Sequence, residues 1–292
     1  MHLYHFDDLR LGAGRGDGTL ADITSLVAPD LPPERRMAAL IAGWDELRPR
    51  AEDAIAAGPA VALTDVTVRA PLPRPANVMA APVNYRLHQQ EMGGDDGVYK
   101  GAVVQTIETY AGFVKASSSV IGPDEPIRLP FADRRFDHEA EVGVVIGRRA
   151  SCVPRERALE HVFGYVPLLD ITMRGAEDRS FRKSFDTFTP IGPAIVTADA
   201  VPDHADIAFE LTVGDELRQR ANTRDLIYDI PRLVELYSSA ITLEPGDLIA
   251  TGTPEGVGEI RPGDAIALTL DGIGRLEMAV AARERIAAGA GR

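Results

Sequence analysis

The segment 136–147 reads FDHEAEVGVVIG and places two carboxylates, Glu139 and Glu141, one residue apart at the start of an apolar run. The β-branched residues of that run favour a strand, in which side chains at i and i+2 point to the same face. The two anions therefore repel each other unless water or a cation lies between them. A hard divalent cation relieves the repulsion, with Mg²⁺ or Mn²⁺ favoured and Ca²⁺ also compatible. The alternative is a half-exposed strand whose outer face is acidic and solvated.

A third acid follows in a second apolar segment, 162–171, which reads VFGYVPLLDI and has Asp170 near its end. A carboxylate at the end of a buried strand costs several kcal/mol unless it is paired or binds a metal. We therefore predict that Asp170 is the third ligand of the same metal ion.

A candidate acid/base pair lies upstream, in a short helix predicted after the strand-like residues 78–81. His88 and Glu91 are three residues apart, which makes them neighbours on a helix. Glu91 would orient the His88 imidazole and raise its basicity, as a general base requires. The alternative is an ordinary surface pair. Glycines at 93, 94 and 97 predict a mobile segment, and residues 84–97 would suit a lid that closes over a substrate.

Two further features offer contacts for an anion. Lys115 stands between apolar and small residues, where it either contacts an anion or extends its amine to solvent from a strand. A glycine-rich turn at 251–258 follows the apolar residues 248–250, and its backbone N–H groups with the Thr253 hydroxyl could hold a carboxylate. The alternative for this turn is a tight hairpin.

Composition limits the partners. The chain has 292 residues, of which 45% are hydrophobic, so it can form one large domain, or one domain with a small lobe, around a real core. Its 44 acidic and 31 basic residues give a net charge of −13 without a basic cluster, which argues against nucleic acid and anionic membranes as partners. The single cysteine, Cys152, excludes an internal disulfide and a thiolate metal cluster.

The hydropathy pattern predicts a location. No basic-then-apolar leader opens the sequence, and no apolar run approaches the ~18 residues of a membrane span. We therefore expect a soluble, cytoplasmic protein with no membrane contact.

The first part of the chain is predicted to form a separate lobe. Residues 2–11 suit a strand or hairpin and residues 12–18 a turn. Residues 32–57 have apolar side chains at helical spacing, and the proline-rich residues 66–75 suit an extended linker. We place the boundary there, with a small N-terminal lobe at 1–70 and a metal-binding catalytic domain at 71–292.

Six motifs occur in order between residues 84 and 258. They read N-Y-x-x-H-x-x-E, F-x-K-x-S-S, E-x-E-x-x-x-V-I-G, D-x-T-x-R, K-S-F-D-T-F-x-P-I-G-P and T-G-T-P-x-G-V-G. No single motif is sufficient, but the ordered set resembles the fumarylacetoacetate hydrolase family, in particular its bacterial acylpyruvase or fumarylpyruvate hydrolase-like members. The resemblance covers roughly residues 72–282, and the first lobe resembles the small N-terminal domain of many bacterial members.

The resemblance implies a fold and a ligand set. The fold is α+β and mostly β, a mixed β-sandwich or β-roll with a small N-terminal α+β lobe, and family members are usually homodimers. The acids of the E-x-E and D-x-T-x-R motifs ligate Mg²⁺ or Mn²⁺ in the family, and they correspond here to Glu139, Glu141 and Asp170. The lid dyad corresponds to His88 and Glu91.

The resemblance also implies the remaining site residues, and the chain departs from the family pattern near two of the motifs. Lys183 corresponds to a catalytic lysine beside the metal, and the candidate substrate-binding residues are Tyr85, Lys115, Arg174, Glu177 and Thr253. The family often has a second Asp and a Gln after the arginine of D-x-T-x-R, where this chain has Gly175 and Glu177. Ala81 and Pro82 also replace a glycine-containing turn. These departures put the substrate in doubt and leave the metal ligands intact.

The chemistry expected of such a site is hydrolysis of a C–C bond. Family substrates are acylpyruvates and related 2-oxo or 2-hydroxydienoic acids from aromatic catabolism. A 3-acylpyruvate can chelate a divalent cation, which stabilises the enolate left when the bond breaks. His88 would activate water, and Lys183 would stabilise developing negative charge. The alternatives are a decarboxylase or isomerase of oxaloacetate-like or 2-hydroxydienedioate acids on the same scaffold, and, third, a non-catalytic acidic metal-binding module.

Overall fold

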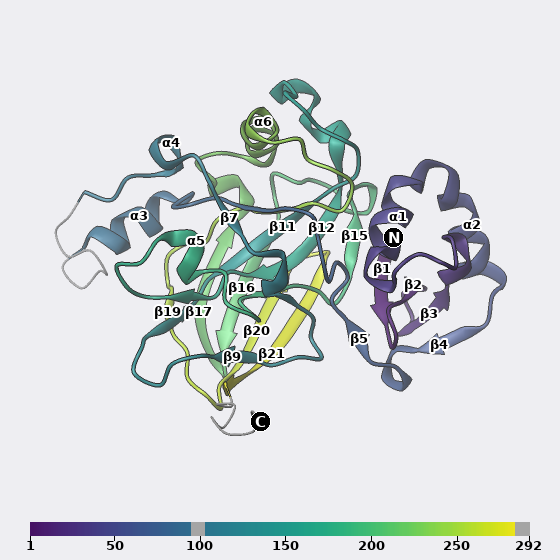
Figure 1. Ribbon diagram of the computed structural model, residues 1–292, viewed down its shortest axis with the longest axis horizontal. Coiled ribbons are helices and arrows are strands. Elements are labelled where there is room, and N and C mark those ends of the chain that lie inside the picture. Colours follow the sequence, from purple (N-terminus) through teal and green to yellow (C-terminus); the bar gives the residue numbers. More distant parts are fainter. Residues whose placement is uncertain (95–102, 284–292) are drawn as a thin grey trace, which may run out of the picture.

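The computed structural model describes residues 1–94 and 103–283, and strands form its centre (Figure 1). The largest sheet has eleven strands in the described chain, in the order β4-β3-β2-β1-β15-β12-β11-β18-β6-β7, with β5 beside β1. Its strands are β1 His2–Phe6, β2 Arg10–Gly14, β3 Thr19–Asp22, β4 Ala60–Ala62, β5 Val68–Arg69, β6 Val78–Ala80, β7 Phe113–Lys115, β11 Ala140–Ile146, β12 Val162–Leu169, β15 Ile195–Thr197 and β18 Leu248–Ala250.

Smaller sheets complete the β structure. A second sheet has the order β17-β16-β20-β21-β9, and its strands are β9 Ile127–Leu129, β16 Ala208–Val213, β17 Glu216–Asn222, β20 Ala265–Leu270 and β21 Gly274–Ala282. A three-stranded sheet joins β10 Phe136–His138 with β13 Thr172–Met173 and β19 Gly258–Glu259. A parallel pair joins β8 Val120–Ile121 and β14 Thr189–Pro190.

The helices are short and lie around the sheets. They are α1 Arg36–Ala42, α2 Trp44–Ala57, α3 Arg86–Gly93, α4 Ile107–Tyr110, α5 Arg179–Arg182 and α6 Ile230–Ala240. The 3-10 turns are Thr24–Leu26, Pro33–Arg35, Leu63–Asp65, Ser117–Ser119, Arg155–His161, Ala198–Ala200 and Thr223–Asp225. This arrangement is the expected α+β class, with more strands than helices in the described residues. Within the described ranges, no helix combines the length and the apolar character that crossing a bilayer requires.

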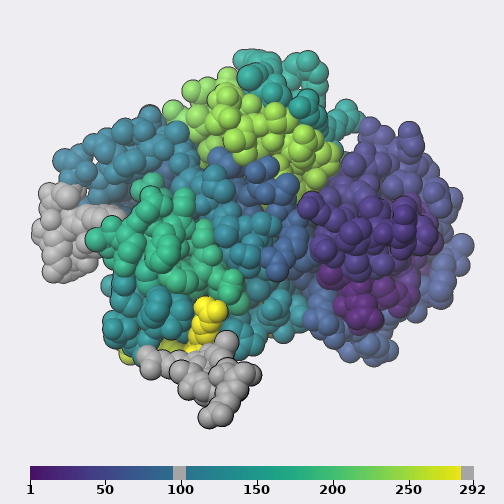
Figure 2. All heavy atoms as spheres, in the orientation of Figure 1, coloured from purple at the N-terminus to yellow at the C-terminus, as the bar shows by residue number. Residues whose placement is uncertain are grey.

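Residues 1–70 form a bulge at one end of the molecule (Figure 2). Its strands nevertheless belong to the large sheet, because β1 pairs antiparallel with β15 through His2 opposite Val196 and Leu3 opposite Ile195. The predicted linker is also tied into this sheet, since β5 pairs with β1. The division at residue 70 stays a prediction.

Two local predictions in this lobe are corrected by the structure. Residues 12–14 belong to β2 and not to the expected turn, because they pair with β3. The single helix expected over 32–57 is two helices that break at Gly43, a residue that weakens a helix interior. The break lets Trp44 turn toward the body, where its ring meets Phe163 edge-on at 5.4 Å between centroids.

The helix α6 packs against the larger apolar core. Asp229 caps it by accepting a hydrogen bond from the Arg232 backbone N–H at 2.9 Å, a contribution of about 1 kcal/mol. Its inward face is apolar, and each such side chain contributes about 1.5–3 kcal/mol when fully buried. The buried residues of this helix are Ile230, Leu233, Val234, Tyr237 and Ser238.

The segment that carries the E-x-E motif forms two strands that are interrupted at Glu139. Phe136–His138 pairs with β13 and β19 in the small sheet, whereas Ala140–Ile146 runs between β12 and β18 in the large one. Glu139 lies at the crossover, and its carbonyl accepts a hydrogen bond from the Asp170 N–H at 2.9 Å. The change of sheet therefore brings the ends of β10, β11 and β12 to one point.

Burial of His5 makes the lobe sensitive to acid. The His5 side chain is fully buried in β1, and its Nδ1–H donates to the Ala70 carbonyl at 3.2 Å. Its Nε2 has no partner in the described part of the chain, so protonation would bury an unsatisfied donor. Burial lowers the pKa of His5 from 6.5 to about 4.

We expect the free energy of unfolding to fall as the pH drops from 7 to 5. Over this range His5 becomes protonated in the unfolded state and stays mostly neutral in the folded state. The part due to His5 is about 2 kcal/mol over this range. Urea unfolding of His5→Gln, which keeps a donor and removes the titration, should show that much less pH dependence than the parent. The half-buried His204→Gln serves as the control. Equal slopes for parent and His5→Gln would contradict the assignment.

Candidate metal centre and active site

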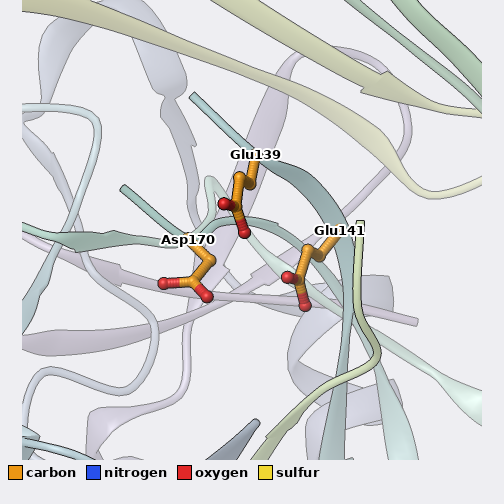
Figure 3. Close-up of side chains that lie close together, drawn as sticks. All are labelled: Glu139, Glu141 and Asp170. Atoms are coloured by element: carbon orange, nitrogen blue, oxygen red, sulfur yellow. The ribbon is translucent and has the colours of Figure 1, made fainter. Parts of the chain in front are cut away.

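Three buried carboxylates meet where β11 and β12 end. Glu139, Glu141 and Asp170 each offer an oxygen, and these three atoms lie within 4.8 Å of one another (Figure 3). The antiparallel pairing of Ala140 with Leu169 sets the Glu139 and Asp170 backbones side by side, and the i, i+2 spacing brings in Glu141. The convergence of these acids, predicted from the sequence, is present in the structure.

Cationic side chains balance two of the three acids. Lys183 Nζ donates to Glu139 Oε2 at 2.7 Å, to Asp170 Oδ2 at 2.6 Å and to the Thr172 hydroxyl at 2.6 Å. Lys115 Nζ pairs with the other Asp170 oxygen and donates to the Phe188 carbonyl at 2.9 Å. All three Lys183 protons are thus engaged.

Glu139 is held as an anion. Arg174 Nη2 donates to Glu139 Oε1 at 3.1 Å, in addition to the bond from Lys183. Burial by itself raises the pKa of Glu139, but the charges of Lys183 and Arg174 outweigh it, so that this pKa lies well below its ordinary value.

Glu141 has no such partner. Within the described residues, no cationic side chain lies in salt-bridge distance of its carboxylate, and the Gly252 N–H donates to its Oε2 at 2.7 Å. Burial and the neighbouring charge of Asp170 raise the pKa of Glu141 well above its usual range. The triad therefore has room for more positive charge. A divalent cation with oxygen ligands fits this donor set.

The glycine-rich turn after β18 connects the acids to the rest of the site. Gly252 has φ +96°, and a Cβ there would lie 2.7 Å from the Asn84 Cβ, so a side chain is excluded. Thr253 Oγ1 accepts a hydrogen bond from Gln219 Nε2 at 2.8 Å. The Gly256 N–H donates to Glu91 Oε1 at 2.8 Å.

His88 and Glu91 form the predicted pair on α3. His88 Nδ1 donates to Glu91 Oε2 at 3.1 Å, and the ring is 3% exposed. Because a carboxylate accepts only, the proton of the neutral imidazole lies on Nδ1, and Nε2 keeps its lone pair. The Gly256 contact fixes Glu91 in turn.

One cavity of ≈ 30 Å³ joins these groups. Of the predicted site residues, five line it: His88, Glu139, Arg174, Lys183 and Thr253. The cavity is also lined by Ala81 and Pro82, the positions that depart from the family turn, and by Arg179 and Arg182 of α5. One member of the His88–Glu91 pair and one member of the carboxylate triad, His88 and Glu139, thus line the same small cavity.

Three of the predicted substrate-binding residues do not line this cavity. Tyr85 is 2% exposed beneath α3, with its ring edge-on to Phe209. Lys115 is buried against Asp170. Glu177 pairs with Arg134 at 2.8 Å, which lowers the pKa of Glu177 to about 2. The roles of all three stay predictions, and Gly97 of the predicted lid lies outside the described residues.

The sequence analysis missed several residues that hold the site. Asp137 is fully buried, accepts from Arg174 Nε at 2.6 Å and so aims that guanidinium at Glu139. Gln219 is buried and joins Thr253 to the Ala140 N–H and His138 Nδ1. Asp137 directly precedes H-E-x-E and could have been included, whereas an isolated Gln in an alternating strand carries no signal.

Comparison with known proteins places this site in a family. The model of the fumarylacetoacetate (FAA) hydrolase C-terminal domain matches residues 77–281, which is more than half of the chain. The chain belongs to the fumarylacetoacetate hydrolase family. The expected α+β class is confirmed by the same match.

Members of the family include near relatives of this chain. A maleylpyruvate hydrolase of Aquipseudomonas alcaligenes is 42% identical over 286 residues, which are 96% of this chain and 99% of that protein. A crystal structure of maleylpyruvate hydrolase from Sphingobium sp. SYK-6, in complex with manganese(II) ion and pyruvate, has a TM-score of 0.86 and 40% identity, covering 97% of this chain and 100% of that one. An oxaloacetate tautomerase of Bacillus subtilis is 36% identical over 227 residues, 73% of each protein.

Glu141→Gln tests the metal centre without disrupting its ion pairs. The amide can still accept from Gly252, and it replaces a buried carboxylate that has no salt-bridge partner among residues 1–94 and 103–283. We expect the metal-free variant to unfold at or above the parent temperature, while its Mn²⁺ affinity falls about 100-fold or more because a ligand charge is lost. Calorimetric titration with Mn²⁺ and the Mn²⁺-dependent rise in unfolding temperature measure both.

Asp170→Asn is the matched contrast. It also removes a ligand charge, but it leaves Lys115 and Lys183 short of a buried partner, so it should destabilise the metal-free protein by about 3–5 kcal/mol. Undiminished Mn²⁺ stabilisation of Glu141→Gln would show that the ion binds elsewhere.

Proposed function

We propose that this protein is a hydrolase that depends on Mn²⁺ or Mg²⁺ and cleaves the C–C bond of 3-acylpyruvates such as maleylpyruvate, releasing pyruvate. The observation that carries the proposal is one cavity lined both by Glu139 of the buried carboxylate triad and by His88, which Glu91 orients. The similarity to two maleylpyruvate hydrolases, one of them in complex with manganese(II) ion and pyruvate, supports the choice of substrate and metal.

Glu139, Glu141 and Asp170 are the residues that would hold the ion. A divalent cation there would polarise the 2-oxo group of the substrate and make the pyruvate enolate a better leaving group. Lys183, which contacts Glu139 and Asp170, would exchange at least one of these contacts for the substrate and stabilise negative charge on it through an N–H group of its ammonium.

His88 is the general base in this proposal. Its Nε2 takes a proton from a water molecule, whose oxygen adds to the acyl carbonyl and forms a C–O bond. The C–C bond between that carbonyl and the pyruvate methylene then breaks, and its electron pair stays on the methylene carbon. The His88 imidazolium returns its proton to that carbon, which gives pyruvate, and the acyl group is released as a carboxylic acid. Glu91 stabilises the imidazolium that forms between these steps.

Access to the cavity requires movement of α3. A space of ≈ 30 Å³ holds about one water molecule and not a dioxo acid. The helix is attached by a small apolar cluster of Val83, Met92 and Val104, and by a hydrogen bond from Gln89 Nε2 to the Val104 carbonyl at 2.7 Å. It also makes polar contacts, from Arg86 to Glu108 and from the Gly256 N–H to Glu91. Such limited apolar packing makes a helix easier to displace. We propose that α3 opens to admit the substrate and closes to bring His88 back to it.

A second candidate function uses the same ion and a different outcome. The similarity to the oxaloacetate tautomerase of Bacillus subtilis indicates that this scaffold also supports keto–enol conversion without cleavage of a C–C bond. Isomerisation of hydroxydienedioates and decarboxylation of oxaloacetate pass through the same type of enolate. We rank hydrolysis first because the His88–Glu91 pair provides water activation, which a decarboxylase does not need. A non-catalytic metal-binding module is the third candidate.

Assembly and location belong to this proposal as well. We propose a homodimer, following the family resemblance, and a cytoplasmic location, following the composition. Sedimentation velocity on the purified protein tests the first, and cell fractionation tests the second.

Product analysis separates the candidates. With Mn²⁺ and maleylpyruvate, we expect equimolar pyruvate and maleate by chromatography. Release of carbon dioxide from oxaloacetate without acylpyruvate cleavage would favour the decarboxylase, and enol–keto conversion alone would favour the tautomerase. If the protein converts none of these substrates, the result would favour the non-catalytic metal-binding module.

His88→Gln tests the base. We expect kcat for acylpyruvate cleavage to fall by about 10²–10⁴-fold, because the amide cannot accept the proton, while Mn²⁺ affinity changes less than about twofold. His204→Gln, outside the cavity, should match the parent in both measurements. Cleavage by His88→Gln at the parent rate would show that another group activates the water.

A further inference from the structure

The cavity contains more positive charge than the carboxylate triad uses. Lys115, Lys183 and Arg174 are all paired with the triad or with Asp137. The short helix α5 adds two further guanidinium groups to the cavity lining, from Arg179 and Arg182. The concentration of cationic side chains at the cavity is local, because the chain as a whole carries a net charge of −13.

Arg179 is the guanidinium that is available to a ligand. No carboxylate of the described residues lies in salt-bridge or hydrogen-bond distance of it. Its contacts are aromatic, with Cζ 4.6 Å from the centroid of the Tyr110 ring and 5.7 Å from that of Phe113. Stacking on rings fixes the plane of a guanidinium and leaves its N–H edge free for a bidentate carboxylate.

The position of Arg179 relative to the metal centre follows from Phe113. The same ring has Lys183 Nζ at 5.6 Å from its centroid, and that ammonium contacts Glu139 and Asp170. Arg179 is therefore one aromatic ring away from the lysine at the metal centre. Arg179, Lys183 and Glu139 line the same cavity, so a ligand bound at the triad can extend within it toward the Arg179 guanidinium.

We propose that Arg179 binds a carboxylate at the far end of the acyl group, so that the site selects 2,4-dioxo acids with two terminal carboxylates over acylpyruvates with a neutral acyl chain. This inference rests on the proposed function, since it names the substrate class of the same site. Arg179 is in this view a specificity-determining residue that takes no part in the bond cleavage. Two N–H groups on one edge of its guanidinium pair with the two oxygens of the distal carboxylate, a geometry that lysine cannot offer.

Paired substrates test the inference by activity. The parent should cleave maleylpyruvate with a higher kcat/KM than acetylpyruvate, which lacks the distal carboxylate. Arg179→Gln should lower kcat/KM for maleylpyruvate by about 10- to 100-fold and leave acetylpyruvate within about twofold. Arg179→Lys should recover part of the loss, and Arg275→Gln on the exposed face of β21 should behave as the parent. Equal losses on both substrates, or no loss on either, would overturn the inference.

Binding of unreactive acids tests it without turnover. In the presence of Mn²⁺, calorimetry should show that the parent binds 2-oxopimelate about 10-fold or more tightly than 2-oxoheptanoate, which differs only in the terminal carboxylate, and that Arg179→Gln has lost this preference. If the parent cleaves no acylpyruvate but shows the Arg179-dependent preference, the proposed function fails and this inference stands. If it cleaves acylpyruvates and shows no preference, the function stands and this inference fails.

Discussion

The repulsion among three buried carboxylates is the constraint on which this structure depends. Three oxygens of Glu139, Glu141 and Asp170 within 4.8 Å would not stay ionised in a buried site without compensation. Lysine and arginine side chains compensate two of the acids, and Glu141 remains without a cation in the described part of the chain. Without a metal, the negative charge of the triad is therefore only partly compensated. Such a site favours binding of a divalent ion, with release of a proton.

Sheet pairing brings the three acids close to other residues of the candidate site. The strand β11 is bonded to β12 on one side and to β18 on the other, so one acid pair and one glycine-rich turn meet at the same end. The turn then contacts Glu141 through Gly252 and Glu91 through Gly256. A single backbone loop thereby couples the metal ligands to the acid/base pair on α3. The proposed displacement of α3 would break the contact with Glu91 and leave that with Glu141 in place.

Much of the site could be predicted from local spacing, and its surroundings could not. The i, i+2 acids and the i, i+3 His–Glu pair follow from strand and helix geometry. An acid at the end of a buried strand indicated Asp170, and the motif order supplied Lys183 and the family. The interruption at Glu139 depends on pairing with β13 and β19, partners distant in sequence. The continuity of the large sheet through β1 and β15 is likewise non-local. Arg179 was missed because it lies in the segment where this chain departs from the family pattern.

The central claim is that the triad is a metal site open to an oxo acid. Crystals grown with Mn²⁺ and pyruvate, measured for anomalous scattering of manganese, test it most directly. The account predicts one strong peak with oxygens of Glu139, Glu141 and Asp170 at roughly 2.1 Å, pyruvate oxygens completing the coordination, and Lys183 withdrawn from at least one carboxylate. A peak elsewhere, or a triad that keeps all its Lys183 contacts in the presence of saturating manganese, would contradict it.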